Sequence, residues 1–189
     1  MDKVSLKGNK IIKPEGTFID FNAIAKGYGG VDVVGEFLES RNVKNYLVNI
    51  GGELRARGLN KASGKIWTVG VENPNFNGTQ SINKVLSLKD KAMATSGTYR
   101  KFKIDADGNR YAHIIDTKTG YPSKTNLLSI SVIADNCMTA DAYATAFKAM
   151  GIERVKTFLE SHPELKVFLI FENDRKEFET LSLNGFGEN

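Results

Sequence analysis

Short stretches typical of β-strands, separated by turn residues, are the feature that most limits the folds open to this chain of 189 residues. Apolar and polar residues that alternate with a period of two indicate strands with one buried face. Stretches of this kind, or short apolar runs, occupy 3–7, 10–13, 45–50, 53–59, 65–72, 81–88, 91–96, 99–105, 110–115, 127–134, 166–172 and 176–183. A further strand is expected to end at 18–20. Turn residues at 8–9, 107–109 and 173–174 predict hairpins.

Helical spacing is confined to three stretches, 23–41, 136–149 and 152–161. In the first, the apolar residues near helical spacing are Ile24, Tyr28, Val31, Val34, Phe37 and Leu38. Many strands and few helices predict a mixed α+β fold, in which helices pack on a mixed or antiparallel sheet. The length and the absence of a convincing linker predict one domain over residues 1–189.

The first helical stretch carries three early glycines, Gly27, Gly29 and Gly30. Each costs about 1 kcal/mol of helix stability relative to alanine. A sequence that accepts this cost predicts that another group approaches the helix backbone closely.

The composition excludes several classes of protein. Hydrophobic residues make up 41% and charged residues 25% of the chain, as is usual for a soluble globular protein. The net charge is +4, but the basic residues are scattered, which argues against a nucleic-acid partner. A single cysteine, Cys137, excludes an internal disulfide framework. No apolar run has membrane-spanning length and the first thirteen residues lack a signal-peptide core, so the sequence leaves the location open.

Two oxygen-bearing side chains are expected on one face of the helix at 136–149. Asp141 and Thr145 are four residues apart, so they lie one helical turn from each other. A carboxylate and a hydroxyl are hard donors that suit Mg²⁺ or Ca²⁺. The alternative is a structural role, with the acid favouring the helix dipole and the threonine bonding its own backbone.

The stretch IDFNAIAKGYG at 19–29 has the pattern of an anion site, because small residues open a helix and Lys26 adds a positive charge. The alternative is an N-cap at Asp20 or Asn22 and a solvated lysine. In ATSGTYRKF at 94–102, small residues around Gly97 would let a ring or a phosphate approach the backbone, or would simply form a turn.

His113 is one of only two histidines, and its ordinary pKa near 6.5 suits proton transfer near neutrality. A lone histidine is more often structural. The other, His162, has the position of a residue that caps a helix C-terminus.

Taken together, DFNAIAKGYG, NIGGE, ATSGTYRKF, HIIDTKTGYP and TADAYATA occur in one order in one chain. This combination resembles the ApbE family, the FAD:protein FMN transferases, over about residues 18–183. The resemblance implies a T-fold-like domain that forms the C-terminal part of the family's full length.

The resemblance also implies roles for particular residues. Asp141, Thr145 and the backbone carbonyl of Ala23 match the magnesium ligands. The matches to flavin-nucleotide contacts are Asp20, Lys26, Thr95, Ser96, Gly97, His113, Ile114 and Ile115. His113 matches the histidine implicated in transfer, with Asp116 as the second candidate for a catalytic base. Asn49, Gly51 and Gly52 match a family loop for which the sequence gives no role.

The implied reaction moves FMN from FAD to a Ser or Thr hydroxyl of an acceptor flavoprotein subunit of the redox-pump type, with Mg²⁺, and releases AMP. Two alternatives are a Mg²⁺-dependent FAD pyrophosphatase that gives FMN and AMP, and a FAD-binding module without turnover. Family members are well over half as long again, with an N-terminal segment that helps to enclose the flavin. A second chain is therefore a possible partner that completes the flavin pocket. Relatives usually act outside the cytoplasmic membrane.

Overall fold

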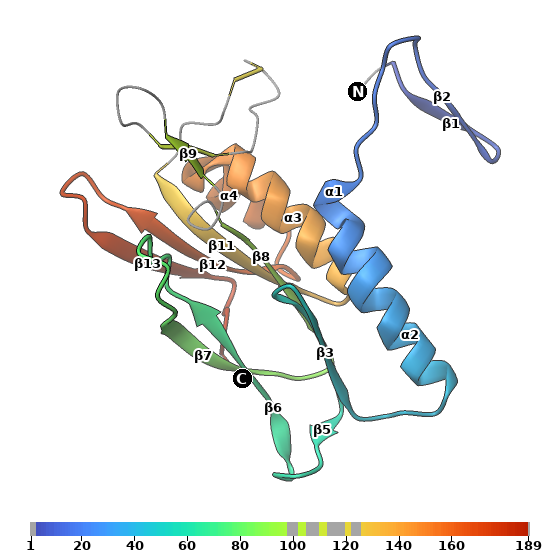
Figure 1. The fold of residues 1–189 in the computed structure, drawn as a ribbon, viewed down its shortest axis with the longest axis vertical. Coiled ribbons are helices and arrows are strands. Elements are labelled where there is room, and N and C mark those ends of the chain that lie inside the picture. The colour runs from blue at the N-terminus through green and yellow to red at the C-terminus, as the bar shows by residue number, and fades with distance from the viewer. Residues whose placement is uncertain (1–2, 98–101, 105–109, 113–119, 122–125, 189) are drawn as a thin grey trace.

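The computed structural model describes residues 3–97, 102–104, 110–112, 120–121 and 126–188. Its central element is a six-stranded sheet in which all neighbouring strands are antiparallel (Figure 1). In spatial order the strands are β13 (Phe178–Leu183), β12 (Lys166–Glu172), β11 (Leu127–Ala134), β8 (Ala92–Gly97), β4 (Glu53–Arg57) and β3 (Tyr46–Ile50). Every residue of β11 is buried, as its apolar sequence and its central position require.

Two helices cover one face of this sheet, α3 (Cys137–Met150) and α4 (Ile152–Leu159). Helices and sheet share one buried core, made of Ala94, Leu127, Ile130, Val132, Ala134, Ala140, Ala144, Phe147, Val155, Leu159, Leu165, Val167 and Leu169. Alanines on α3 let the helix lie close to the sheet. The predicted α+β class, with helices on an antiparallel sheet, is confirmed.

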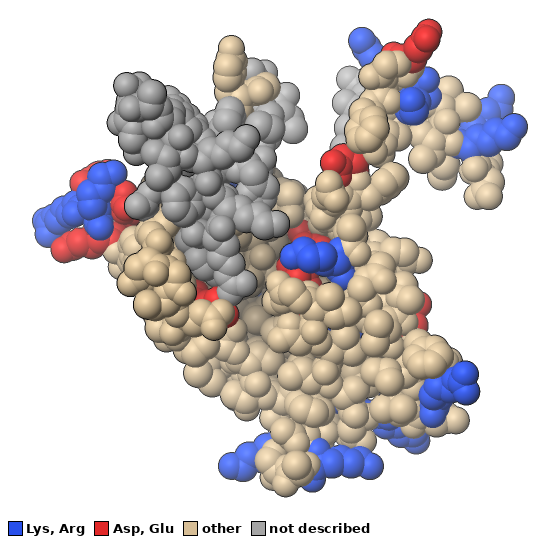
Figure 2. Space-filling model, viewed as in Figure 1, with Lys and Arg blue, Asp and Glu red and all other residues tan. Residues whose placement is uncertain are grey.

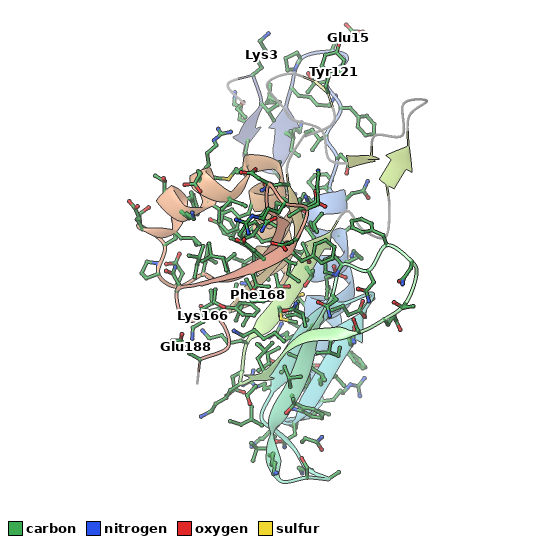
Figure 3. All side chains as sticks on the ribbon, turned by 90° about the vertical axis from the view of Figure 1, so that its left-hand side faces the viewer. Lys3, Glu15, Tyr121, Lys166, Phe168 and Glu188 are labelled. Carbon is green, nitrogen blue, oxygen red and sulfur yellow. The ribbon has the colours of Figure 1, made fainter. Side chains whose placement is uncertain are left out.

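The opposite face of the sheet packs against a smaller sheet of β5 (Leu59–Asn60), β6 (Lys65–Glu72) and β7 (Ile82–Leu88). Phe168 projects into this second core and stacks on Phe186 at a centroid distance of 5.4 Å (Figure 3). A strand that alternates between two cores is buried on both sides, which explains why β12 reads as an apolar run.

Three hairpins were predicted at turn residues and all are present as antiparallel pairs, including β12 with β13 around residues 173–174. β1 (Ser5–Lys7) pairs with β2 (Lys10–Ile12), and β9 (Phe102–Ile104) pairs with β10 (Arg110–Ala112). The β1–β2 hairpin projects from the body of the molecule (Figure 1), and its apolar side chains Leu6, Ile11 and Ile12 are exposed. No helix in the described part of the chain is long and apolar enough to cross a membrane.

The helical stretch predicted at 23–41 consists of three consecutive segments, α1 (Asn22–Ile24), η1 (Ala25–Asp32) and α2 (Val33–Ser40). The middle segment is a π-helix, whose hydrogen bonds span five residues instead of four. The apolar face predicted from α-helical spacing is therefore partly wrong, because Tyr28 and Phe37 are exposed. The predicted strand at 18–20 is also absent, since these residues lie in an irregular segment before α1.

A close contact with α3 explains why position 27 of this helix is a glycine. A Cβ atom at this position would lie 2.5 Å from the backbone oxygen of Cys137 and 2.8 Å from the Cβ of Asp141, both on α3. The buried residues of η1 and α2 are Gly27, Val31, Asp32 and Gly35, and the absence of a side chain at Gly27 lets the backbone of η1 touch α3. The close approach predicted from the glycines is confirmed at this position.

We expect Gly27→Ala to lower the free energy of unfolding by about 1–3 kcal/mol, because the added methyl group must displace the backbone of α3. Gly29→Ala is a matched control, since nothing lies within 4 Å of a Cβ at Gly29. Urea unfolding followed by the fluorescence of Trp67, the only tryptophan, measures both variants. Equal stabilities for the two would contradict the close contact.

Candidate functional site

The contact between η1 and α3 places a buried carboxylate at the beginning of the site. Asp141 lies in the second turn of α3, and its Oδ2 accepts a hydrogen bond of 2.9 Å from the backbone N–H of Gly27. The side chain is buried, and burial raises the pKa of the Asp141 carboxyl group, while the Gly27 N–H and the charge of Lys26 oppose that rise. A carboxylate held in this way is a fixed negative charge beside the N-terminal helical segments.

Two hydroxyl groups lie near this carboxylate, one on α3 and one on β8. Thr145 follows Asp141 by one turn on α3, and its Oγ1 is 3.2 Å from Oγ of Ser96 on β8. Ala23 lies on α1, which packs against α3. The structure therefore brings η1, α3 and β8 together at one junction, where a carboxylate and two hydroxyl groups are close in space.

A cation lies on the η1 side of this junction. Lys26 Nζ is 2.5 Å from Oε1 of Glu53, and the Lys26 side chain is 52% exposed whereas that of Glu53 is 2% exposed. Burial raises the pKa of the Glu53 carboxyl group, and Lys26 opposes that rise. Sequence reasoning did not find Glu53. The only signal was its position in the NIGGE segment, which carries no distance information.

Asp20, Thr95 and Gly97, which were expected at the site, lie in three different settings. Asp20 is exposed, and its carboxylate accepts 2.6 and 3.0 Å hydrogen bonds from the backbone and side-chain nitrogens of Asn22, so it forms a local turn. Thr95 Oγ1 lies 2.7 Å from Oγ of Ser131, its partner across the strands. Because side chains alternate along a strand, Thr95 lies on the opposite face of β8 from Ser96. Gly97 is the last residue of β8.

The other predicted site residues, His113, Ile114, Ile115 and Asp116, lie outside the described residues. Tyr121, in the same sequence motif, is exposed and lies at the same end of the long axis as Lys3 and Glu15 (Figure 3). The described Lys and Arg side chains on the face shown in Figure 2 are dispersed over it.

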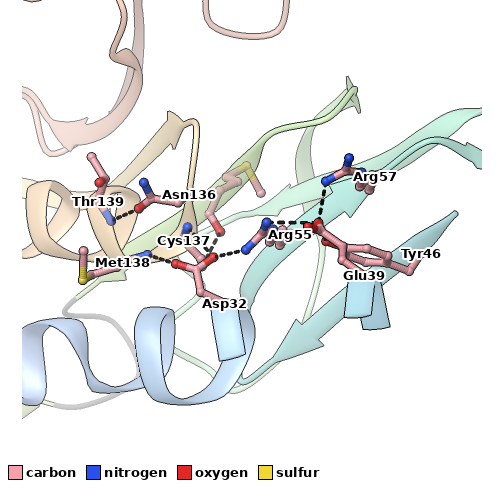
Figure 4. A network of polar contacts seen from close by, with 10 residues as sticks. Asp32, Glu39, Tyr46, Arg55, Arg57, Asn136, Cys137, Met138 and Thr139 are labelled. Carbon is pink, nitrogen blue, oxygen red and sulfur yellow. Dashed lines mark hydrogen bonds and ion pairs between the residues drawn. The ribbon is translucent and has the colours of Figure 1, made fainter. Parts of the chain in front are cut away.

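A buried aspartate that the sequence analysis missed joins η1 to the beginning of α3 (Figure 4). Asp32 accepts hydrogen bonds from the backbone N–H groups of Cys137 at 3.0 Å and Met138 at 2.8 Å, the first two residues of α3. Negative charge at a helix N-terminus is favourable, and here it comes from another element. Asp32 and Asp141 thus bind η1 to α3 at two points.

The same aspartate begins a chain of ion pairs that reaches β3 and β4. Arg55 contacts Asp32 at 3.1 Å and Glu39 at 3.2 Å, and Arg57 contacts Glu39 at 2.7 Å (Figure 4). The hydroxyl of Tyr46 donates to Glu39 at 2.6 Å; burial and this bond raise the pKa of Tyr46 to about 12. The network holds α2 against the sheet, which also stabilises the position of η1 at the junction.

The oxygen groups at the junction are of a kind that could hold Mg²⁺. The carboxylate of Asp141, the hydroxyl of Thr145 and the backbone carbonyl of Ala23 are hard donors, which suit Mg²⁺ better than zinc. The described residues include no group of three or more His, Cys, Asp or Glu side chains that could hold a metal ion. Such a magnesium ion would therefore depend on few protein carboxylates, as is usual when a phosphate ligand completes its coordination.

The sequence model of the ApbE family matches residues 1–169. A protein of Vibrio cholerae named FAD:protein FMN transferase is 38% identical over 98% of this chain and 55% of its own length. A protein of the same name from Haemophilus influenzae is 40% identical over 98% of this chain and 54% of its own length. The chain thus spans about half the length of these curated relatives.

Solved structures show the same similarity. The flavin transferase ApbE from Vibrio cholerae superposes with a TM-score of 0.83 and 37% identity, over 96% of this chain and 56% of that one. The ApbE protein from Thermotoga maritima gives a TM-score of 0.81 and 28% identity, over 100% of this chain and 60% of that one.

We expect Asp32→Asn to lower the free energy of unfolding by about 3 kcal/mol, because the amide places a donor against groups that all donate and leaves Arg55 with one acidic partner fewer. Glu36→Gln on α2 is the control. Glu36 is exposed, and a change within about 0.5 kcal/mol is expected there. Urea unfolding measures both. An Asp32→Asn variant as stable as the control would show that the contacts with α3 contribute little.

Proposed function

The chain belongs to the ApbE family, and we propose that it moves FMN from FAD to a Ser or Thr hydroxyl of an acceptor protein and releases AMP. The observation that carries this proposal is the junction of η1, α3 and β8. It combines the carboxylate of Asp141, the hydroxyls of Thr145 and Ser96, and the cation of Lys26. Relatives named FAD:protein FMN transferase, 38% and 40% identical, support the same activity.

We assign the binding of Mg²⁺ to Asp141, Thr145 and the carbonyl of Ala23. When bound, Mg²⁺ neutralises negative charge on a pyrophosphate and helps to align it. Lys26 contributes a second positive charge to the same group, since it lies on η1 with its side chain half exposed. Ser96 orients the hydroxyl of Thr145 through the contact between the two oxygens.

The chemical step exchanges one phosphorus–oxygen bond for another. The acceptor hydroxyl oxygen forms a bond to the FMN-side phosphorus, and the bond from that phosphorus to the bridging oxygen breaks, so AMP leaves with that oxygen. The hydroxyl proton passes to a base, for which His113 is the first candidate and Asp116 the second. General base catalysis of this kind contributes about 10²–10⁴-fold.

We further propose that polypeptide on a second chain completes the flavin pocket. Next to Asp20, Phe18 is 89% exposed and Phe21 is 58% exposed. Covering exposed aromatic rings with another protein surface lowers the free energy.

The proposed reaction is tested by incubating the chain with FAD and Mg²⁺, with and without a peptide that carries Asp, two spacer residues and Ser/Thr-Gly-Ala-Ser/Thr. We expect AMP and a flavinylated peptide, measured by chromatography and mass spectrometry, only when the peptide is present. Free FMN in both reactions would support the pyrophosphatase instead. FAD binding without either product would support a binding module.

We expect His113→Ala to bind FAD as the unchanged chain does and to transfer FMN at least about tenfold more slowly, because the variant lacks the base. Fluorescence titration with FAD and the rate of peptide flavinylation measure the two effects separately. His162→Ala is the control, since His162 contacts Glu164 and stacks on Phe158 at the end of α4. Transfer at the unchanged rate in His113→Ala would remove this histidine from the mechanism.

A further inference from the structure

The cation of the proposed site has a partner that no motif analysis connects with it. Lys26 lies on η1, where its side chain is half exposed. A lysine side chain that is free in water loses much rotamer freedom when a ligand immobilises it. A lysine already held in place in the free protein avoids that loss, so the group that holds Lys26 affects how well it binds an anion.

The NIGGE segment, residues 49–53, builds that holding group. Gly51 and Gly52 form the turn between β3 and β4 with φ angles of +66° and +103°, a conformation that favours glycine. The side-chain oxygen of Asn49 accepts a hydrogen bond of 3.2 Å from the N–H of Gly52 and closes the turn. Glu53 follows as the first residue of β4.

Glu53 has an unusual environment for an acid. It is 1% exposed, its Oε1 accepts from Lys26 at 2.5 Å, and its Oε2 is buried with no hydrogen-bond partner among the described residues. An unpaired buried carboxylate is costly, and the ion pair with Lys26 offsets part of that cost. If Lys26 moved away, the buried carboxylate of Glu53 would have no cation beside it. The free energy that this would cost favours the position that Lys26 occupies.

The ion pair lies next to the glycine turn. A Cβ on Gly51 would lie 3.5 Å from Oε2 of Glu53 and 3.7 Å from Cδ of Lys26. Both side chains therefore pass beside the turn. Gly27, the residue after Lys26, donates its N–H to Asp141 at 2.9 Å, which places the ion pair close to the proposed magnesium ligands.

We propose that Glu53 is a positioning residue of this site: it holds Lys26 so that the remaining N–H donors of the ammonium group face the pyrophosphate of a dinucleotide. An ammonium group has three donors, and Glu53 takes one of them. This assigns a task to the NIGGE segment. The inference rests on the proposed function, because it takes the ligand of Lys26 to be FAD.

Positioning and simple charge cancellation predict opposite results. If Glu53 only weakens the charge of Lys26, then removing Glu53 makes Lys26 more important for binding an anion. If Glu53 holds Lys26 in place, then removing Glu53 lets the lysine move away, and Lys26 becomes less important. The test therefore compares the effect of losing Lys26 in the presence and in the absence of Glu53.

The experiment is a double-mutant cycle on FAD affinity, measured by fluorescence titration in the presence of Mg²⁺. We expect Lys26→Met to weaken FAD binding at least tenfold in the unchanged chain and less than threefold in the Glu53→Leu background. Glu53→Gln keeps an oxygen that can accept from Lys26, so in that background Lys26→Met should have an intermediate effect. The Glu153–Lys156 pair on α4 is the matched control, and Lys156→Met with Glu153→Leu should leave FAD affinity unchanged.

A larger effect of Lys26→Met in the Glu53→Leu background overturns the proposal in favour of charge cancellation. An effect of equal size in both backgrounds, or no effect in the unchanged chain, also overturns it. The same cycle on urea unfolding reports the ion pair without FAD, and if Glu53→Leu does not fold, Glu53→Gln decides between the outcomes. Product formation without coupling would refute this inference alone, whereas coupling without product would refute only the transfer reaction.

Discussion

The contact between the backbone of η1 and the first turns of α3 is the constraint on which the rest of this structure depends. Two buried aspartates make it: Asp141 reaches from α3 to the N–H of Gly27, and Asp32 reaches from η1 to the N–H groups of Cys137 and Met138. Each carboxylate replaces the water it loses with backbone donors, so both charges are tolerated inside the protein. The absence of a side chain at Gly27 allows the approach, and the three hydrogen bonds fix the register of the helices.

This junction explains how acidic, hydroxylic and basic groups occupy one small region. The sheet contributes Ser96 through β8, α3 contributes Asp141 and Thr145, and η1 contributes Lys26. None of these elements could place the group alone, because each supplies only one or two donors. A site that binds a pyrophosphate with two negative charges needs more positive than negative charge. Glu53 and Asp141 are both acids, so cations are required near them. The proposed magnesium ion and Lys26 meet that requirement from two sides.

The sequence predicted those features that local patterns determine. Nearly all strands, the hairpin pairs, the helices α3 and α4 and the four-residue spacing of Asp141 and Thr145 follow from periodicity and turn residues. The glycines also predicted a close backbone contact. The missed features depend on partners far apart in the chain: Glu53 is 27 residues from Lys26, and Asp32 is 105 residues from Cys137. The prediction of the buried face assumed α-helical spacing throughout, whereas residues 25–32 form a π-helix, and Tyr28 on this segment is exposed.

The contacts of Asp32 have a consequence for sequence drift. Its partners on α3 are main-chain N–H groups, which every amino acid except proline provides. As far as these hydrogen bonds are concerned, positions 137 and 138 are free to change over evolutionary time, within the space available to the buried Cys137. The acid itself has no such freedom. Divergent relatives could therefore lose all sequence similarity at the start of this helix and still keep the contact between η1 and α3.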